Sequence, residues 1–507
     1  MRGALLVAGT HSDAGKSVVV AGICRWLARR GVRVAPFKAQ NMALNSVVTP
    51  DGAEIGRAQA VQAAAAGLEP EAAMNPILIK PSGDRHSQVI VMGKPYGDAD
   101  ARSHQAMKAQ LRPIVASALA GLRERFDVVV CEGAGSPAEI NLRHADLTNM
   151  WLAREAGMPV LVVADIDRGG VFASLFGTLA LLGLEDQAHV AGFVINKFRG
   201  DESILAPGLI ELEQRTGRPT LGVLPHLDDL WMDVEDSLAL EGRRAETPGE
   251  GDSLDVAVIR LRWMSNFTDA DALAAEPGVR VRFTRSPSDV ERADLVVVPG
   301  TKATVEDLER LRADGLAGAL AARAAAQQPV LGICGGYQLL GERIEDDVES
   351  KTGAVTGLGV LPVRTTFAPD KVLRRRSGRS PLLDADAGGY EIRHGRVERQ
   401  GGESLLLADD GEADGCAWGS VLGTSWHGVL EHDGFRRALL SRVAAARGRR
   451  FVPGRSPFAA AREQRHDALG DLVGNHMDTE RLTALIDGGT PSDLPTIETE
   501  LRSCCAS

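Results

Sequence analysis

Short apolar segments recur through the N-terminal half of the chain, and each ends in polar or glycine-rich residues. The segments start at Ala4, Val32, Asp127, Pro159 and Val190. Near-continuous apolar runs of this kind are typical of parallel strands that helices cover on both faces. The pattern predicts an α/β domain built on a doubly wound parallel sheet.

A second series of apolar segments follows in the C-terminal half. These segments start at Leu254, Val279, Asp294, Val330 and Val421. Residues 241–253, between the two series, are rich in charge, glycine and proline and have no apolar period, which is typical of a linker. We therefore predict a first domain over residues 1–240 and a second α/β domain over residues 254–447.

The last part of the chain has a different pattern. Apolar positions recur at helical spacing between residues 458 and 486. We predict a helical extension over residues 448–490, docked on the second domain or between the two domains. The polar tail, residues 491–507, is predicted to be disordered.

A glycine-rich loop follows the first apolar segment. Its sequence is Gly9-Thr10-His-Ser-Asp-Ala-Gly15-Lys16-Ser17, and a helical pattern continues from it. Strand, glycine loop and helix form the context of a phosphate-binding loop, although the spacing is one residue longer than the usual motif. Backbone N–H groups from Gly9, Thr10 and Gly15 are expected to cradle phosphates. Lys16 is expected to reach the outer phosphates, and Ser17 to hold Mg²⁺.

Polar residues collect where the predicted strands of this domain end. Open α/β sheets bind ligands at this edge, although any single residue there can equally be an ordinary surface group. Glu132 is the candidate for Mg²⁺ or its bound water. The other candidates at these ends and in nearby loops are Lys38, Gln40, Asn41, Asp51, Asp165, Asp167, Arg168 and Asn196. The first domain is therefore predicted to be a P-loop ATPase.

Composition narrows the class of protein. The chain has 507 residues, of which 44% are hydrophobic and 25% charged, as in soluble globular proteins. Its formal net charge of −11 argues against nucleic-acid binding and gives no electrostatic reason for binding an anionic membrane. Six cysteines show no disulfide framework, and no apolar stretch approaches the length of a membrane span. We predict a cytoplasmic protein and leave its oligomeric state open, a homo-oligomer included.

The segment from Val330 to Gly341 places a cysteine between two glycines, in the order Gly332-Ile-Cys334-Gly-Gly336, before a helical pattern. This arrangement predicts a nucleophile elbow in which a strained turn exposes the cysteine side chain. The helix N-terminus is expected to favour the thiolate, and the N–H of Gly335 to donate to an oxyanion. The alternative is an ordinary buried cysteine. A Pro-Gly turn that includes Gly300 is expected to offer the second N–H.

A cysteine nucleophile requires a base, and His427 is the strongest candidate. It closes the segment that starts at Val421 and is followed by a glycine, so its ring can project from a strand end. His226, His394, His432, His466 and His476 are interpreted as surface or structural residues.

The motifs together resemble known enzymes. The elbow with its later histidine looks like a class I glutamine amidotransferase domain, and the phosphate loop, Glu132-Gly-Ala-Gly and Asn196-Lys resemble dethiobiotin synthetase and its relatives. The two domains, fused in this order, are similar to the cobyric acid synthase family up to about residue 485. Four further motifs carry this resemblance: Lys38-Ala-Gln40-Asn41, Glu54-Ile-Gly-Arg-Ala-Gln59, Asp165-Ile-Asp167-Arg168 and Asn196-Lys-Phe-Arg-Gly-Asp.

The resemblance implies a function for each half. It implies that ATP-Mg²⁺ and glutamine drive amidation of the b, d, e and g carboxylates of adenosylcobyrinic acid a,c-diamide, a corrinoid. It also implies that Asn196 recognises the adenine edge, and that Lys38, Gln40, Asn41, Asp51, Asp165, Asp167 and Arg168 meet the corrinoid or the metal.

Two positions depart from the usual glutaminase pattern. Val429 stands where ordinary class I domains carry the glutamate that orients the histidine. Glu431 is a substitute, but an exposed glutamate is the simpler interpretation. Arg393 stands where the motif Gly389-Tyr-Glu-Ile-x-x-Gly carries histidine, so no role is transferred there.

Two other functions stay open from the sequence. One is cobyrinic acid a,c-diamide synthase, which shares the domain order and both chemistries. The other is a nucleotide-switched interaction ATPase with a degenerate glutaminase domain. Switch ATPases of this kind carry a second lysine near the start of the phosphate loop, and His11 in that position argues against the second alternative. His11 itself is either a neighbour of the phosphates or substrate or a plain loop residue.

Overall fold

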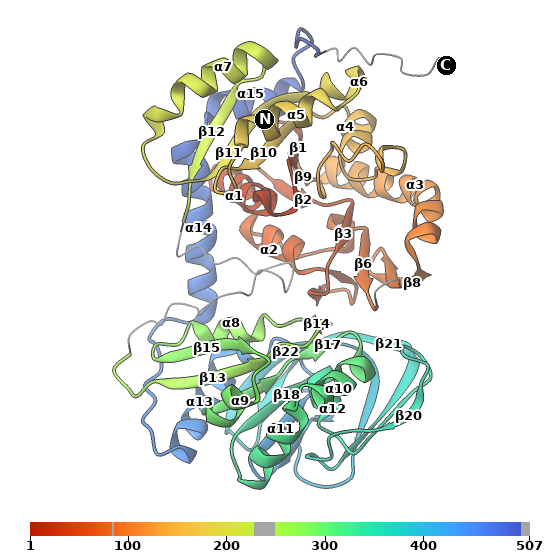
Figure 1. Ribbon diagram of the computed structural model, residues 1–507, viewed down its shortest axis with the longest axis vertical. Coiled ribbons are helices and arrows are strands. Elements are labelled where there is room, and N and C mark those ends of the chain that lie inside the picture. Colours follow the sequence, from red (N-terminus) through yellow and green to blue (C-terminus); the bar gives the residue numbers. More distant parts are fainter. Residues whose placement is uncertain (84–85, 228–248, 498–507) are drawn as a thin grey trace.

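The structure, a computed structural model, describes residues 1–83, 86–227 and 249–497. Its first domain is organised around a parallel sheet of six strands in the order β12-β11-β10-β1-β9-β2 (Figure 1). In chain order these strands are β1 (Gly3–Gly9), β2 (Val34–Phe37), β9 (Val128–Glu132), β10 (Val160–Asp165), β11 (Val190–Phe198) and β12 (Thr220–Pro225). Each one coincides with an apolar run, because both faces of the sheet are covered by helices.

The helices of this domain are α1 (Lys16–Ala28), α2 (Arg57–Ala65), α3 (Ala101–Arg125), α4 (Met150–Ala156), α5 (Val171–Ala180), α6 (Leu184–Gln187) and α7 (Ala206–Thr216). Apolar residues on the two faces of the sheet belong to separate cores. The doubly wound parallel sheet predicted from the sequence is confirmed.

A smaller layer, antiparallel except where β3 pairs with β6, extends the first domain toward the second and was not predicted. One sheet has the order β3-β6-β7-β8, and β4 pairs with β5 as a hairpin. The strands are β3 (Gln40–Met42), β4 (Ser46–Val48), β5 (Glu54–Gly56), β6 (Ile77–Pro81), β7 (Ser87–Val91) and β8 (Lys94–Ala99). These strands are short, and polar residues interrupt them, so their apolar pattern is weak.

The second domain is built on another six-stranded sheet, in the order β15-β13-β16-β18-β26-β25, parallel except at β25. The strands are β13 (Leu254–Ile259), β15 (Val279–Thr284), β16 (Leu295–Val298), β18 (Val330–Ile333), β25 (Cys416–Trp418) and β26 (Val421–Thr424). Its helices are α8 (Asp269–Ala274), α9 (Pro287–Arg292), α10 (Thr304–Ala313), α11 (Leu316–Ala325), α12 (Gly335–Leu339) and α13 (Asp433–Ala446). The predicted class, two successive α/β domains, is confirmed.

A long antiparallel hairpin dominates the other sheet of the second domain. It consists of β21 (Val363–Ser380) and β22 (Ala385–Arg399), joined at its edges by β19 (Arg343–Asp346), β20 (Gly353–Thr356), β23 (Leu406–Ala408) and β24 (Ala413–Asp414). A further short pair links β14 (Met264–Ser265) to β17 (Gly300–Thr301). The hairpin is rich in arginine and has no simple apolar alternation, so no strand was predicted there.

The C-terminal helices return to the first domain. Helix α14 (Phe458–His476) runs from the second domain along α1, and α15 (Thr479–Gly488) packs beside β1 and β12 (Figure 1). Arg25 of α1 bonds to Asp467 of α14 at 2.9 Å, and Arg29 bonds to Asp471 at 2.7 Å. Residues 448–490 therefore clamp the two domains together.

The predicted domain boundaries differ in how they compare with the structure. The predicted end of the first domain at residue 240 and most of the predicted linker lie outside the described residues. The disordered tail was predicted to begin at residue 491, but residues 491–497 pack on the first domain. Ile497 exchanges two hydrogen bonds with Gln187, at 2.7 and 3.1 Å, so this part of the prediction is wrong. Residues 498–507 lie outside the described part of the chain.

Candidate active site

The phosphate loop joins β1 to α1 as predicted from strand, glycine and helix. Gly15 has φ 98°, a left-handed conformation suited to glycine, and any side chain there would collide with the amide of Asn196. Asn196, at the end of β11, donates to the carbonyl of Ala14 at 3.1 Å. The loop is thus supported from beneath by a residue that was expected to contact adenine.

Lys16 lies folded over this loop. Its Nζ donates to the carbonyl oxygens of His11 (2.9 Å), Ser12 (3.0 Å) and Gly135 (3.3 Å). An ammonium group with three carbonyl partners at the N-terminus of a helix is placed to exchange them for phosphate oxygens.

Glu132 is the centre of a buried polar cluster at the end of β9. Its Oε1 accepts from Ser17 Oγ and from Lys38 Nζ, both at 2.9 Å, and its Oε2 accepts from Gln62 Nε2 at 2.5 Å. Burial alone would raise the pKa of this carboxyl group, but the charge of Lys38 and the hydrogen bonds from Lys38 and Gln62 hold it below its usual range. Glu132 is therefore an anion beside Ser17.

Around this cluster, several buried polar atoms have no hydrogen-bond partner among the described residues. They are Thr10 Oγ1, His11 Nδ1, Gln40 Oε1, Gln59 Nε2, Gln62 Oε1 and Asn149 Oδ1. Buried polar groups are normally paired, so these atoms fit a polar ligand such as a nucleotide with its metal. No group of three or more His, Cys, Asp or Glu side chains suited to a metal occurs in the described parts of the chain.

Asp165, Asp167 and Arg168 were predicted as one group, but they do not all lie at the phosphate loop. Asp165 is buried and pairs with Lys197 at 2.7 Å, while Lys197 also donates to the carbonyl of Asp13 in the phosphate loop at 3.0 Å. Arg168 pairs with the carboxylate of Asp13 at 2.9 Å. Asp165 and Arg168 thus adjoin the loop, whereas the carboxylate of Asp167 is half exposed.

The predicted site residues that follow β2 also lie in different places. Asn41 is buried and donates to Gln59 at 3.0 Å, and Gln40 lines a cavity with Gly135 and Asn149. Asp51 lies in the exposed β4–β5 turn, where it accepts from Thr49 at 2.5 Å. The structure therefore brings Lys38 and Gln40 near the phosphate loop, places Asn41 against Gln59 of α2, and places Asp51 in a separate turn.

Cys334 lies at the elbow between β18 and α12. Its φ of 50° and ψ of −108° are strained for a residue other than glycine, and side chains at Gly332 or Gly336 would collide with backbone atoms. The Cys334 N–H donates to the carbonyl of Thr424 at 2.8 Å, and its Sγ lies 3.8 Å from the carbonyl oxygen of Ile392. The strained turn that the glycines predicted is present, but the expected exposure is not, because the Cys334 side chain is buried.

The expected preference for thiolate is not seen. Burial raises the pKa of the Cys334 thiol to about 12, although the charge of Arg393 and the N–H of Gly335 act in the opposite direction. Helix α12 has only five residues, so its dipole is too weak to offset the loss of water around the sulfur. Burial therefore favours the neutral thiol at Cys334.

The two expected oxyanion donors differ in position. Gly335 lines the pocket that contains Cys334. Gly300 pairs with Ser265 in the β14–β17 ladder, and Thr301 lines the pocket in the position expected for Gly300. The backbone N of Thr301 lies against Gly335. The candidate for the second oxyanion donor is therefore the backbone N–H of Thr301 rather than that of Gly300.

His427 follows β26, the strand beside β18, so it shares a sheet edge with Cys334. Its ring stacks on Tyr390 at 5.7 Å between centroids and 27° between planes, and lies against Gly300. Burial lowers its pKa to about 3, helped by the charges of Lys80 and Arg57. The imidazole is therefore neutral, and the lowered pKa makes it a weaker base than a free histidine.

Within the described residues, Nδ1 of His427 has no hydrogen-bond partner. Glu431 was interpreted as exposed, but its carboxylate accepts from Arg57 at 2.5 Å and from Arg462 at 3.0 Å. This correction gives Glu431 a role in docking the domains and leaves it without contact to the imidazole.

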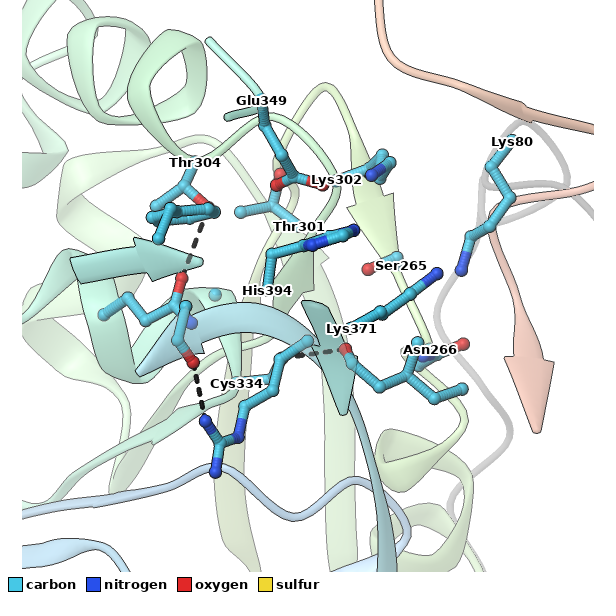
Figure 2. A pocket seen from close by; sticks show the side chains of 16 residues that line it. Lys80, Ser265, Asn266, Thr301, Lys302, Thr304, Cys334, Glu349, Lys371 and His394 are labelled. Carbon is cyan, nitrogen blue, oxygen red and sulfur yellow. Dashed lines mark hydrogen bonds and ion pairs between the residues drawn. The ribbon is translucent and has the colours of Figure 1, made fainter. Parts of the chain in front are cut away.

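The pocket around Cys334 contains residues that sequence reasoning did not assign. They include Lys80, Lys302, Glu349, Lys371, Arg393 and His394 (Figure 2). His394 is predicted from the sequence to be a surface or structural residue. It is buried, and its Nδ1 lies 3.0 Å from the carbonyl oxygen of Ala368. Lys80 comes from the first domain, so no motif of the second domain could have indicated it.

A phosphate-loop domain joined to a domain with a cysteine elbow and a nearby histidine defines a glutamine-dependent amidotransferase that uses ATP. Comparison with known families agrees with both halves. Residues 5–238 match the CobQ/CobB/MinD/ParA nucleotide binding domain, and residues 255–435 match the CobB/CobQ-like glutamine amidotransferase domain.

Curated relatives resemble the chain over almost its whole length. Proteins named cobyric acid synthase from Frankia casuarinae and Streptomyces avermitilis are each 59% identical, over 98% of this chain and 99% of theirs. The one from Rhodococcus jostii is 57% identical over 99% of both chains. The chain belongs to the cobyric acid synthase family, glutamine amidotransferase ligases of cobalamin biosynthesis.

The family assignment decides between the alternatives left open by the sequence. Neither cobyrinic acid a,c-diamide synthase nor a nucleotide-switched interaction protein is favoured. Its substrates are a corrinoid and glutamine, and its nucleotide-binding domain uses ATP. Across the described ranges, the helices are too short or too polar to cross a bilayer.

Proposed function

We propose that this protein amidates the b, d, e and g carboxylates of adenosylcobyrinic acid a,c-diamide, giving adenosylcobyric acid. One observation carries the proposal: Lys80 of the nucleotide-binding domain lines the pocket of the predicted nucleophile Cys334. A shared boundary of this kind suits an enzyme that releases ammonia in one domain and consumes it in the other.

In the first domain, the substrate carboxylate must be activated, because a carboxylate is a poor acyl donor. The γ-phosphoryl group of ATP passes to a carboxylate oxygen, and ADP leaves. Lys16 and the loop N–H groups stabilise charge on the phosphoryl group. Ser17 and Glu132 would hold Mg²⁺, which neutralises phosphate charge during transfer. Lys38 keeps Glu132 ionised, and Asp165 and Arg168 border the same site.

In the second domain, Cys334 attacks the amide carbon of glutamine. His427, neutral in its buried position, accepts the thiol proton and returns it to the departing ammonia. The N–H groups of Gly335 and Thr301 stabilise the oxyanion. Water then hydrolyses the thioester and releases glutamate. Ammonia attacks the acyl phosphate, phosphate leaves, and the amide is formed.

The experiment is mass spectrometry of the corrinoid product. The protein is incubated with ATP-Mg²⁺, amide-labelled glutamine and either adenosylcobyrinic acid a,c-diamide or cobyrinic acid. We expect stepwise labelling of four carboxylates on the first compound alone. Two amidations of cobyrinic acid would contradict the proposal.

Two variants separate the half-reactions. Cys334→Ala should lose glutamine-dependent amidation and retain amidation with ammonium, whereas Lys16→Ala should lose both. The nitrogen source also tests whether ammonia is sheltered between the domains, since unlabelled ammonium in the buffer should not dilute the label delivered from glutamine.

A further inference from the structure

The wall of the Cys334 pocket is formed by both domains. Lys80, from β6 of the first domain, and Lys371, from β21 of the second, both line it (Figure 2). Their side chains are 3% and 4% exposed, so both ammonium groups are removed from bulk water. Buried lysines of this kind require a compensating charge.

The compensation present is incomplete. Glu54, fully buried in β5, accepts from Lys80 at 2.7 Å through Oε1 and from Lys371 at 2.5 Å through Oε2. The two other partners are neutral: Ser46 Oγ lies 2.8 Å from Lys80, and Gln88 Oε1 lies 3.4 Å from Lys371. Among the residues that the structure describes, two cations thus share one carboxylate, which leaves an excess of one positive charge.

Neighbouring charged groups do not remove this excess. Lys302 pairs with Glu349, and Arg393 pairs with Glu391, which also binds Arg374 and Arg376. Burial lowers the pKa of His394, which keeps its ring neutral. Burial also lowers the pKa of Lys371 to about 8, and the charges of Lys80 and Lys302 add to this effect, although Glu54 opposes it. The pocket therefore carries a positive charge that suits an anionic group.

We propose that Lys80 and Lys371 together bind the α-carboxylate of the glutamine whose side-chain amide lies at Cys334. This inference rests on the proposed glutaminase function of that pocket. The α-carboxylate is the anion that glutamine carries, and it supplies the negative charge that the two lysines lack. Because Lys80 belongs to the nucleotide-binding domain, the glutamine site is complete only when the two domains are docked.

The test compares two reagents that alkylate Cys334. One is 6-diazo-5-oxo-L-norleucine, a glutamine analogue with an α-carboxylate, and the other is iodoacetamide, which has none. Labelling of the full-length enzyme is measured by peptide mass spectrometry without corrinoid. In Lys80→Met and in Lys371→Met we expect the rate ratio of analogue to iodoacetamide to fall about tenfold or more.

The variants are chosen to preserve the fold. Either substitution leaves Glu54 with one lysine, so no unpaired carboxylate is created, and methionine retains the apolar stem. Arg375→Ala is the matched control, because Arg375 also joins the domains, through Glu69 at 2.8 Å and the carbonyl of Val48 at 3.0 Å, but lies outside the pocket lining. Its ratio should stay within about twofold of the wild type.

Each outcome has a separate meaning. An unchanged ratio in both lysine variants overturns the inference. An unchanged ratio combined with weaker corrinoid binding overturns it in favour of a corrinoid carboxylate as the anion. A fall in the Arg375→Ala variant as well would show that loosened docking, rather than lost charge, causes the effect. If the analogue fails to label Cys334 in the wild type, the proposed glutaminase function fails instead.

Discussion

Cys334 and His427 are both held in their uncharged forms. The pKa of the thiol is raised to about 12 and that of the imidazole is lowered to about 3, in each case chiefly by burial. At neutral pH both groups are therefore uncharged, and His427 follows β26, the strand that pairs with the strand before Cys334.

Alkylation of Cys334 by iodoacetamide should reveal this state. Below a thiol pKa of about 12, the thiolate fraction grows about tenfold per pH unit, so the alkylation rate of Cys334 in the enzyme without glutamine should rise about 100-fold between about pH 7 and 9. A plateau in this range would show a thiolate already formed. Peptide mapping separates Cys334 from other cysteines, and Cys334→Ala is the control.

At the scale of elements, α1 serves two purposes. Its N-terminus carries the phosphate loop, while its buried face meets α14, the helix that returns from the second domain. Gly22 allows this approach, because a Cβ at that position would lie 2.7 Å from the carbonyl oxygen of Leu469 and from Cγ2 of Val473. The phosphate loop is thus held in place by a helix about 450 residues later in the chain.

Gly22→Ala should therefore destabilise the protein although alanine favours helices. We expect the free energy of unfolding to fall by about 1–3 kcal/mol, because the added methyl group forces α1 and α14 apart. Gly121→Ala is the control: Gly121 lies in α3 with open space at its Cβ, and its substitution should be neutral or stabilising by up to about 1 kcal/mol. Urea denaturation of both variants measures the difference, and equal effects would disprove the close packing.

At the scale of the whole molecule, three parts of the chain meet at Glu431. Its carboxylate accepts from Arg57 of the first domain and from Arg462 of α14. Nearby, Val47, Val48 and Ile55 of the first domain form an apolar cluster with Tyr390 and Ile392 of the second. Tyr390 also stacks on His427, so the domain interface continues directly into the glutaminase site.

Glu431→Gln should loosen this junction without disabling His427. Arg57, only 6% exposed, loses its charged partner, and we expect the melting temperature to fall by about 2–6 °C. Glu211→Gln, which removes an exposed pair with Arg215, should change it by about 1 °C or less. Differential scanning calorimetry measures both. If Glu431 oriented His427, iodoacetamide labelling of Cys334 at fixed pH would also change in Glu431→Gln; we expect it to stay the same.

The sequence by itself determined the two α/β domains, their order, the phosphate loop and the cysteine elbow. Each of these signals occupies a short contiguous segment, in which a buried strand, glycines and a helix start follow one another, so local sterics and apolar burial suffice to predict it. The family resemblance rests on the same contiguous motifs. Strands with a weak apolar pattern, such as β21 and β22, were not predicted from the sequence. Their residues form cross-strand ion pairs and do not alternate between apolar and polar side chains.

Only the tertiary structure decided how the site is completed. Lys80 and Lys371 are separated by almost 300 residues, and their shared carboxylate, Glu54, brings them to the pocket of Cys334. The neutral state of the thiol, the placement of Thr301 beside Gly335 and the docking role of Glu431 depend in the same way on burial. Burial and charge balance arise from contacts between segments distant in sequence, and no local pattern records them.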